Sequence, residues 1–168
     1  MRIRPAVEAD LPVVIAIEAM AGELFRDVNM ATVADGELPT VERLLPAAHD
    51  GRLLVTVDGS DVLVAFALTG WVDARAHLDQ VSVDPAFAGR GLGRQLMGAA
   101  EQWGRQWDSL TMTLTTFVDV PWNGPYYRRL GWRELPATKL HPELAAIRSY
   151  EASLGLDAWP RTAMIKRL

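Results

Sequence analysis

The chain has 168 residues, enough for one domain that buries roughly two-thirds of its unfolded surface. Its composition, 49% hydrophobic and 23% charged, is that of a globular protein and excludes a disordered one. The formal net charge of -4 excludes bulk attraction to nucleic acid. The absence of cysteine excludes disulfides and thiolate catalysis.

No targeting or metal-binding signal stands out in the chain. Residues 1–12 contain no apolar stretch of signal-peptide length, and no run of about 18 apolar residues occurs anywhere. We therefore expect a cytoplasmic protein that binds no membrane. His49 and His141 have no partner at metal-ligand spacing, so we expect no metal. The six tryptophans occur without a basic tract, which argues against a nucleic-acid partner.

The first forty residues predict a strand followed by a helix. Residues 1–5 are expected to form the strand, and residues 11–22 an apolar helix that tolerates Pro12 in its first turn. Residues 25–39 show no sustained hydrophobic period, which predicts a loop or a broken helix.

A second helix and a hairpin follow. Thr40 can cap a helix that begins at Val41 and stops before Asp50-Gly51, and Pro46 should kink that helix or end it early. Apolar residues alternate over residues 53–57, and residues 62–68 form a continuous apolar run. We expect these two segments to be paired strands.

The next stretch predicts an anion-binding loop. Residues 71–76 should turn the chain into a third antiparallel strand, after which Gly89, Gly91 and Gly93 fall at every second position. Glycines can adopt φ values closed to other residues and can turn several N–H groups toward one point. The helix that follows adds unpaired N–H groups and the positive end of its dipole.

The helix after the glycines predicts a crossover between parallel strands. It carries an apolar stripe at spacings of three and four, made of Leu96, Met97, Ala100, Trp103 and Trp107. Asp108 should end this helix, and Leu110 begins a strand that runs to Phe117. A strand, helix, strand unit of this kind normally joins parallel neighbours.

The C-terminal part predicts two more helices and two strands. Residues 123–130 should form a short helix ended by Gly131, with a strand from Trp132. A helix over residues 142–154 and a last strand over residues 159–168 complete the chain.

Two motifs resemble the GCN5-related N-acetyltransferase family. The first is the loop Ala88-Gly89-Arg90-Gly91-Leu92-Gly93 after VSVDP, where Ala88 occupies a place that the family usually gives to Gln or Arg. The second runs from Asn123 through Tyr126-Tyr127 to Leu130-Gly131-Trp132. The resemblance implies a single α/β domain over residues 1–168. Its mixed, mostly antiparallel sheet would have six to seven strands, flanking helices and a splay between strands four and five.

The resemblance also implies acetyl-coenzyme A as cosubstrate. Its pyrophosphate would lie on the backbone of Ala88, Gly89, Arg90, Gly91, Leu92, Gly93 and Arg94, and its pantetheine arm would pair with Val81, Ser82 and Val83. Asn123 would hydrogen-bond the cofactor arm or cap its own helix. The alternative is a glycine-rich turn that holds no ligand.

Three residues are candidates for catalysis. His77 and Asp79 share a strand face if no bulge intervenes, and either can serve as base for an amine. The segment AHLDQVSV resembles arylalkylamine N-acetyltransferases, which have histidines at both places; the alternative is a surface histidine and a solvated carboxylate. Tyr127 would protonate the leaving thiolate while Tyr126 faces the core, unless both tyrosines only pack.

The resulting functional prediction is transfer of an acetyl group from acetyl-coenzyme A to a primary amine of a small molecule or peptide. No covalent enzyme intermediate is needed. The alternative is a sensor that binds acyl-coenzyme A without turnover. A dinucleotide oxidoreductase is excluded, because antiparallel-type strands precede the loop and its glycine spacing is not that of a Rossmann turn. A homodimer remains open, as does the identity of the amine.

Overall fold

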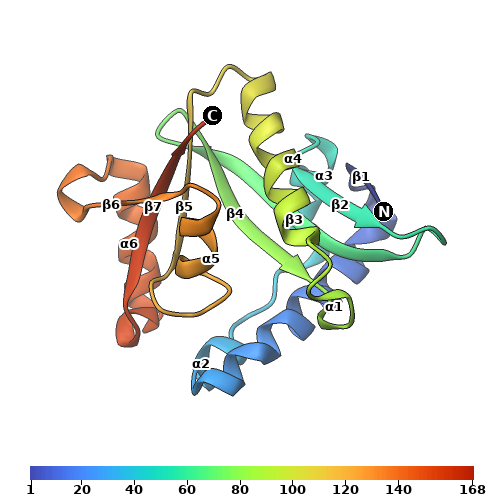
Figure 1. Cartoon of the computed structure of the whole chain (residues 1–168), viewed down its shortest axis with the longest axis horizontal. Helices are drawn as coiled ribbons and strands as arrows, with labels where there is room; N and C mark the ends of the chain where they lie inside the picture. The colour runs from blue at the N-terminus through green and yellow to red at the C-terminus, as the bar shows by residue number, and fades with distance from the viewer. The chain divides into compact units, whose positions relative to one another are not determined.

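The computed structural model describes residues 1–168 and contains a single seven-stranded sheet (Figure 1). The strands are β1 (Arg2–Pro5), β2 (Leu53–Val57), β3 (Leu63–Val72), β4 (Arg75–Val83), β5 (Thr111–Phe117), β6 (Arg133–Leu135) and β7 (Arg161–Arg167). The α-helices are α1 (Leu11–Glu23), α2 (Ala31–Ala34), α3 (Val41–His49), α4 (Leu92–Gln106), α5 (Gly124–Arg129) and α6 (Pro142–Ser153).

The strand order is β1-β2-β3-β4-β5-β7-β6. Strands β4 and β5 run parallel, with Ala76 opposite Met112 and His77 opposite Thr113. The pairs β1–β2, β2–β3, β5–β7 and β6–β7 are antiparallel. These pairings confirm the predicted mixed, mostly antiparallel sheet and its parallel crossover. The splay between the fourth and fifth strands stays a prediction.

The chain forms two compact units. The first comprises Met1–Thr69 and Gln80–Trp103, and the second comprises Gly70–Asp79 and Gly104–Leu168. Strand β4 and helix α4 each begin in one unit and end in the other. The expectation of one domain over residues 1–168 remains a prediction.

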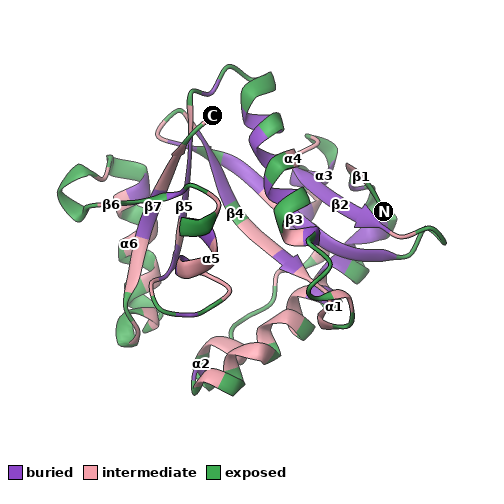
Figure 2. Ribbon diagram, in the orientation of Figure 1, coloured by how far each residue is buried: buried purple, intermediate pink, exposed green.

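The core of the first unit is built by α1 and α3 on strands β2 and β3. Helix α1 contributes Leu11, Val14 and Ile17, whose spacing of three places them on one helical face, and all three are buried. Strands β2 and β3 are mostly buried, as the purple ribbon in Figure 2 shows. The segment after α1 is a broken helix, as predicted, with a short 3-10 turn at Leu24–Val28 followed by α2.

Helix α3 corrects one prediction. Thr40 caps it as expected, since its hydroxyl accepts a bond of 3.3 Å from the amide of Arg43. The helix ends at His49, before Asp50 as predicted, so of the two alternatives for Pro46 the early end is wrong. Ala47 and Ala48, the two residues after Pro46, are buried in the core, and their packing favours the helix despite the lost backbone bond.

The hairpin between β3 and β4 is tighter than predicted. Its turn consists of Asp73 and Ala74 alone, with φ values of 51° and 57°, and both strands reach this turn directly. Two consecutive residues with positive φ match the right-handed twist of the flanking strands. The predicted turn over residues 71–76 is therefore too long.

In the second unit, two apolar residues lie outside the elements that the sequence predicts for them. Helix α4 ends at Gln106 and β5 begins at Thr111, because Asp108 adopts a left-handed φ of 59° between them. Trp107 and Leu110 thus lie outside both elements, 63% and 81% exposed, whereas the predicted stripe and strand had included them. The rest of the stripe, from Leu96 to Trp103, is buried.

Helix α6 is tied to the β3–β4 turn by reciprocal capping. The carboxylate of Asp73 accepts hydrogen bonds from the amides of Glu143 and Leu144 at 2.9 and 3.0 Å. The Glu143 carboxylate in turn accepts a bond from the amide of Asp73. Two otherwise unpaired amides at the start of α6 are thereby satisfied by a residue 70 and 71 positions away in sequence.

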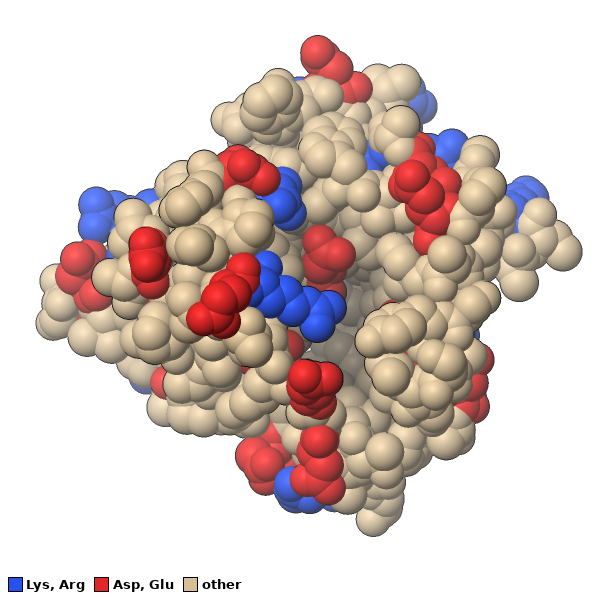
Figure 3. Space-filling model, turned by 180° about the vertical axis from the view of Figure 1, so that it is seen from behind, with Lys and Arg blue, Asp and Glu red and all other residues tan.

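The surface seen in Figure 3 carries acidic and basic side chains interspersed with each other. No helix of the structure is both long enough and apolar enough to cross a membrane.

Candidate active site

The glycine loop of the first unit begins with a short 3-10 turn, Pro85–Phe87, directly after β4. The Asp84 carboxylate accepts a bond of 2.8 Å from the amide of Ala86 and fixes this corner. Gly89 and Gly91 then adopt left-handed φ values of 74° each, as the spacing predicted. Gly93 already lies in the first turn of α4, so two of the three glycines use their conformational freedom.

The start of α4 presents unpaired amides. Its first backbone bond runs from the Gln95 amide to the Gly91 carbonyl at 3.1 Å, so the N–H groups of Leu92, Gly93 and Arg94 have no acceptor within the helix. These groups and the helix dipole favour an anion at this end. Ala88 differs, because its amide donates to the Pro85 carbonyl at 3.1 Å and is occupied by the 3-10 turn.

The loop is open on the side of its glycines. A Cβ atom placed on Gly89 or Gly91 would meet no heavy atom within 4 Å. The guanidinium of Arg90 lies 4.8 Å from the centre of the Phe87 ring, a cation–π contact that holds this charge beside the loop. The arrangement provides room, amides and a positive charge for a phosphate group.

The part of β4 before the loop supplies the predicted cofactor strand. Ser82 is buried and its hydroxyl accepts a bond of 2.9 Å from the Gln80 side chain, while Val81 and Val83 are half-buried. The contacts of these three residues with a cofactor remain a prediction.

His77 is buried in the second unit, with 2% of its surface exposed. Its Nδ1 atom lies 2.7 Å from the hydroxyl oxygen of Thr113, on the neighbouring strand β5. Burial lowers the pKa of the imidazole from 6.5 to about 4, although the negative charge of Glu151 acts in the opposite direction. The alternative of a surface histidine is therefore wrong, and the ring is neutral at pH 7.

Asp79 is exposed, and its carboxylate lies against Gly70 of β3. A Cβ atom added to Gly70 would stand 2.7 Å from Oδ2 of Asp79. The structure therefore makes the two base candidates unlike: a buried neutral imidazole and an exposed carboxylate.

Tyr127 is the buried member of the tyrosine pair in α5, with 7% exposed, whereas Tyr126 is half-buried. The expectation that Tyr126 would take the core side is wrong. Ring centres of Tyr127 and Trp132 are 6.2 Å apart in an edge-on contact. Burial raises the pKa of the Tyr127 phenol above its usual range, so the group stays protonated and can donate a hydrogen bond.

Asn123 precedes α5 but does not cap it through its side chain. Its Nδ2 atom is 3.4 Å from the Trp122 carbonyl, at the long limit of a hydrogen bond. Helix α5 instead depends on Gly124, because a Cβ there would stand 2.3 Å from the Val118 carbonyl oxygen. The side-chain capping alternative for Asn123 is therefore wrong, and the cofactor contact stays a prediction.

Sequence reasoning missed a half-buried ion cluster that contains Glu151, the carboxylate whose charge acts on His77. Glu151 of α6 accepts bonds of 2.5 Å from the Thr115 hydroxyl and 2.7 Å from Arg161, and it also pairs with Arg148. Burial acts to raise the pKa of Glu151, but the opposing effects of Arg161, Thr115 and Arg148 are together larger. The net pKa is therefore below its usual value, and the carboxylate is charged. The apolar spacing of α6 gave no signal for this cluster, because its members come from three distant segments.

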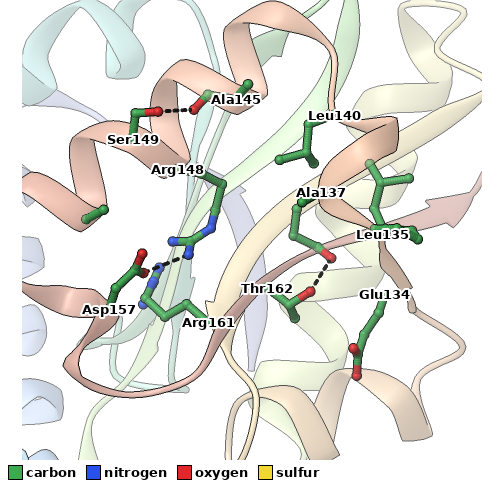
Figure 4. A pocket seen from close by; sticks show the side chains of 13 residues that line it. Glu134, Leu135, Ala137, Leu140, Ala145, Arg148, Ser149, Asp157, Arg161 and Thr162 are labelled. Carbon is green, nitrogen blue, oxygen red and sulfur yellow. Dashed lines mark hydrogen bonds and ion pairs between the residues drawn. The ribbon is translucent and has the colours of Figure 1, made fainter.

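A cavity of about 610 Å³ adjoins this cluster between α6 and the strands β6 and β7 (Figure 4). Figure 4 shows Arg148 reaching from α6 to Asp157, 2.7 Å away. Arg161 and Glu134, which also line the cavity, pair with Glu151 and Arg128. The charges along the lining are thus balanced by neighbours.

The predicted residues divide between the two units. The loop residues and Val81–83 belong to the first unit, whereas His77, Asp79, Asn123 and Tyr127 belong to the second. No group of three or more His, Asp or Glu side chains is placed to hold a metal ion.

A mixed sheet with an anion-binding loop after a central strand, followed by a helix, is typical of coenzyme-A-dependent acyltransferases. The chain belongs to the acetyltransferase (GNAT) family, because the sequence model of that family matches residues 21–132, more than half of its length. The matched span includes the glycine loop and α5. Membership places the protein among the acyltransferases.

Solved structures of low sequence identity share the fold. Ribosomal-protein-alanine N-acetyltransferase from Brucella melitensis is 21% identical, with a TM-score of 0.71 and coverage of 100% of both chains. Rv2747 from Mycobacterium tuberculosis, solved with coenzyme A, is 17% identical, with a TM-score of 0.73 and coverage of 100% and 99%. PaiA N-acetyltransferase from Thermoplasma acidophilum, also solved with coenzyme A, is 14% identical, with a TM-score of 0.70 and coverage of 99% and 98%.

Proposed function

We propose that the protein transfers an acetyl group from acetyl-coenzyme A to a primary amine of a small molecule or peptide. The observation that carries the proposal is the open loop of Gly89 and Gly91 at the start of α4, with amides and Arg90 available for a pyrophosphate. Family membership and the coenzyme A bound in two structural neighbours support the same cosubstrate.

Cofactor binding in this proposal uses the loop, β4 and α5. The amides of Gly89 to Arg94 hold the pyrophosphate, and the guanidinium of Arg90 adds charge. The pantetheine arm pairs with the backbone of Val81–83 as an added strand would, and Asn123 hydrogen-bonds the arm. The Ala88 amide takes no part unless its bond to Pro85 opens.

The chemical step is direct attack. The amine lone pair forms a bond to the thioester carbonyl carbon, and the carbon–sulfur bond breaks. Tyr127 gives its proton to the leaving sulfur, since its raised pKa keeps it protonated. The second proton, which the attacking nitrogen loses as the amide forms, returns to the Tyr127 oxygen. The proton lost by the ammonium group passes to Asp79, to His77 or to water. His77, with a pKa of about 4, is a weak base and acts only if the negative charge of Asp79 raises that value.

The cofactor site is tested by replacing a loop glycine. Gly91→Val should weaken coenzyme A binding at least tenfold, because the side chain fills the open space and strains a φ of 74°. Gly51→Val is the matched control, since Gly51 has a φ of 68° and equally open surroundings away from the loop. The wild type and both variants are titrated calorimetrically with coenzyme A and with a nicotinamide dinucleotide, and the Kd for each ligand is measured. Binding of the dinucleotide alone would refute the proposal.

The acid is tested by removing one hydroxyl. Tyr127→Phe should lower kcat by about 100-fold or more, the usual contribution of a general acid, and leave the Kd for coenzyme A unchanged. Tyr126→Phe, on the neighbouring residue of α5, should retain the wild-type rate. An unchanged kcat in Tyr127→Phe would remove this residue as the proton donor.

A second candidate function is binding of acyl-coenzyme A without turnover. The low pKa of His77 and its bond to Thr113 favour this reading, because they leave the imidazole little capacity to accept a proton. Steady release of free coenzyme A thiol across a panel of amines supports the enzyme. Tight binding of acetyl-coenzyme A with no release supports the sensor.

A further inference from the structure

Gly70 and Asp79 lie against each other on the neighbouring strands β3 and β4 of the second unit. A Cβ atom on Gly70 would be 2.7 Å from Oδ2, 3.7 Å from Cγ and 3.9 Å from Oδ1 of Asp79. A Cβ atom essentially never stands this close to another heavy atom, so one of the two groups would have to move. The carboxylate therefore occupies the space that any side chain at position 70 would need.

A glycine inside a strand is unusual, because it weakens the strand and offers no side chain to pack. Such a residue commonly marks a place where another group must come close to the backbone. At Gly70 that group is the carboxylate of Asp79, which supplies the three nearest heavy atoms. Gly104 and Gly124 differ, since a Cβ on either would meet apolar side chains or backbone of the fold itself.

We propose that Gly70 is a positioning residue that fixes the carboxylate of Asp79 to receive the ammonium group of the acceptor. This inference rests on the proposed acetyl transfer and names its substrate class: amines that arrive as cations. Asp79 is exposed, whereas His77, two residues earlier on the same strand face, is buried and neutral. The carboxylate is thus the member of the pair that can attract a cation from solvent.

The geometry also supplies a mild way to move this carboxylate. The atoms that crowd position 70 belong to the end of a short side chain and not to backbone. In Gly70→Ala the new methyl group should turn Asp79 to another rotamer, and the strand pairing should remain. Gly59→Ala is the matched control, because a Cβ there meets nothing within 4 Å and its φ is not left-handed.

The activity test compares benzylamine, a cation at neutral pH, with aniline, which is uncharged there. For the wild type, thiol release should favour benzylamine in kcat/KM. Gly70→Ala and Asp79→Asn should each raise the KM for benzylamine about tenfold and leave that for aniline within twofold. The double variant should be no worse than either single variant, since both remove one contact.

A second measurement reports the carboxylate directly. In protein labelled with ¹³C at the aspartate carboxyl carbons, the Asp79 resonance, assigned by its loss in Asp79→Asn, should shift in Gly70→Ala and stay in place in Gly59→Ala. An unshifted resonance, or wild-type discrimination between the two amines in Gly70→Ala, overturns the inference while acetyl transfer stands. A wild type that releases no thiol with any amine overturns both.

Discussion

The buried imidazole of His77 should make the stability of the protein depend on pH in a way that one substitution removes. The pKa of His77 falls from 6.5 to about 4 on folding, a difference of about 2.5. Because the folded value is the lower one, the unfolded chain takes up the proton first as the pH falls. The contribution of His77 is complete above pH 6.5 and is lost progressively toward pH 4.

The size of this effect follows from the same values. Each pKa unit corresponds to about 1.4 kcal/mol, so His77 should cost the wild type about 3 kcal/mol of unfolding free energy between pH 7 and pH 4. His77→Gln cannot titrate but can still bond to the Thr113 hydroxyl, so it should lack this loss. Carboxylates also destabilise the fold in acid, and they do so equally in both proteins.

The assay is urea unfolding followed by tryptophan fluorescence at several pH values. As the pH falls from 7 to 4, the unfolding free energy of the wild type should fall by about 3 kcal/mol more than that of His77→Gln. His49→Gln is the control, because His49 is exposed at the end of α3. If the wild type and His77→Gln lost the same unfolding free energy between pH 7 and pH 4, the argument that burial holds this imidazole neutral would be refuted.

Three further predictions concern single polar groups. Thr56 is fully buried and its hydroxyl has no partner, so Thr56→Val should raise the unfolding free energy by about 1 kcal/mol. The hydroxyl of Thr69, which is equally buried, donates to the Arg52 carbonyl at 2.9 Å. Thr69→Val should therefore lower the unfolding free energy by about 1 kcal/mol. Urea unfolding decides both, and shifts of the same sign would contradict the reasoning. Asp73→Ala should cost about 1 kcal/mol by uncapping α6, seen as faster amide exchange in its first turn; unchanged exchange would show that the cap is dispensable.

The local parts of the fold followed from the sequence. Helix α1, the capped start of α3 and the left-handed glycines at positions 89 and 91 each depend on residues within a few positions of one another. Hydrophobic periodicity, helix capping and turn preferences all depend on residues that are close in the sequence, so they predict such features directly. The predictions for Trp107 and Leu110 are wrong because hydrophobic spacing alone assigns these residues to the helix and the strand. The left-handed turn at Asp108 leaves both residues in the connection between these elements.

The properties of the candidate residues were decided by the tertiary structure. The pKa of His77 depends on burial and on Thr113, 36 residues away, and the place of Asp79 depends on a glycine of the adjacent strand. The sequence by itself determined the left-handed glycine loop and the order of the elements, because short-range backbone chemistry sets both. Only the fold decided which of His77 and Asp79 is neutral and which meets solvent, because desolvation and strand pairing join residues that the sequence keeps apart.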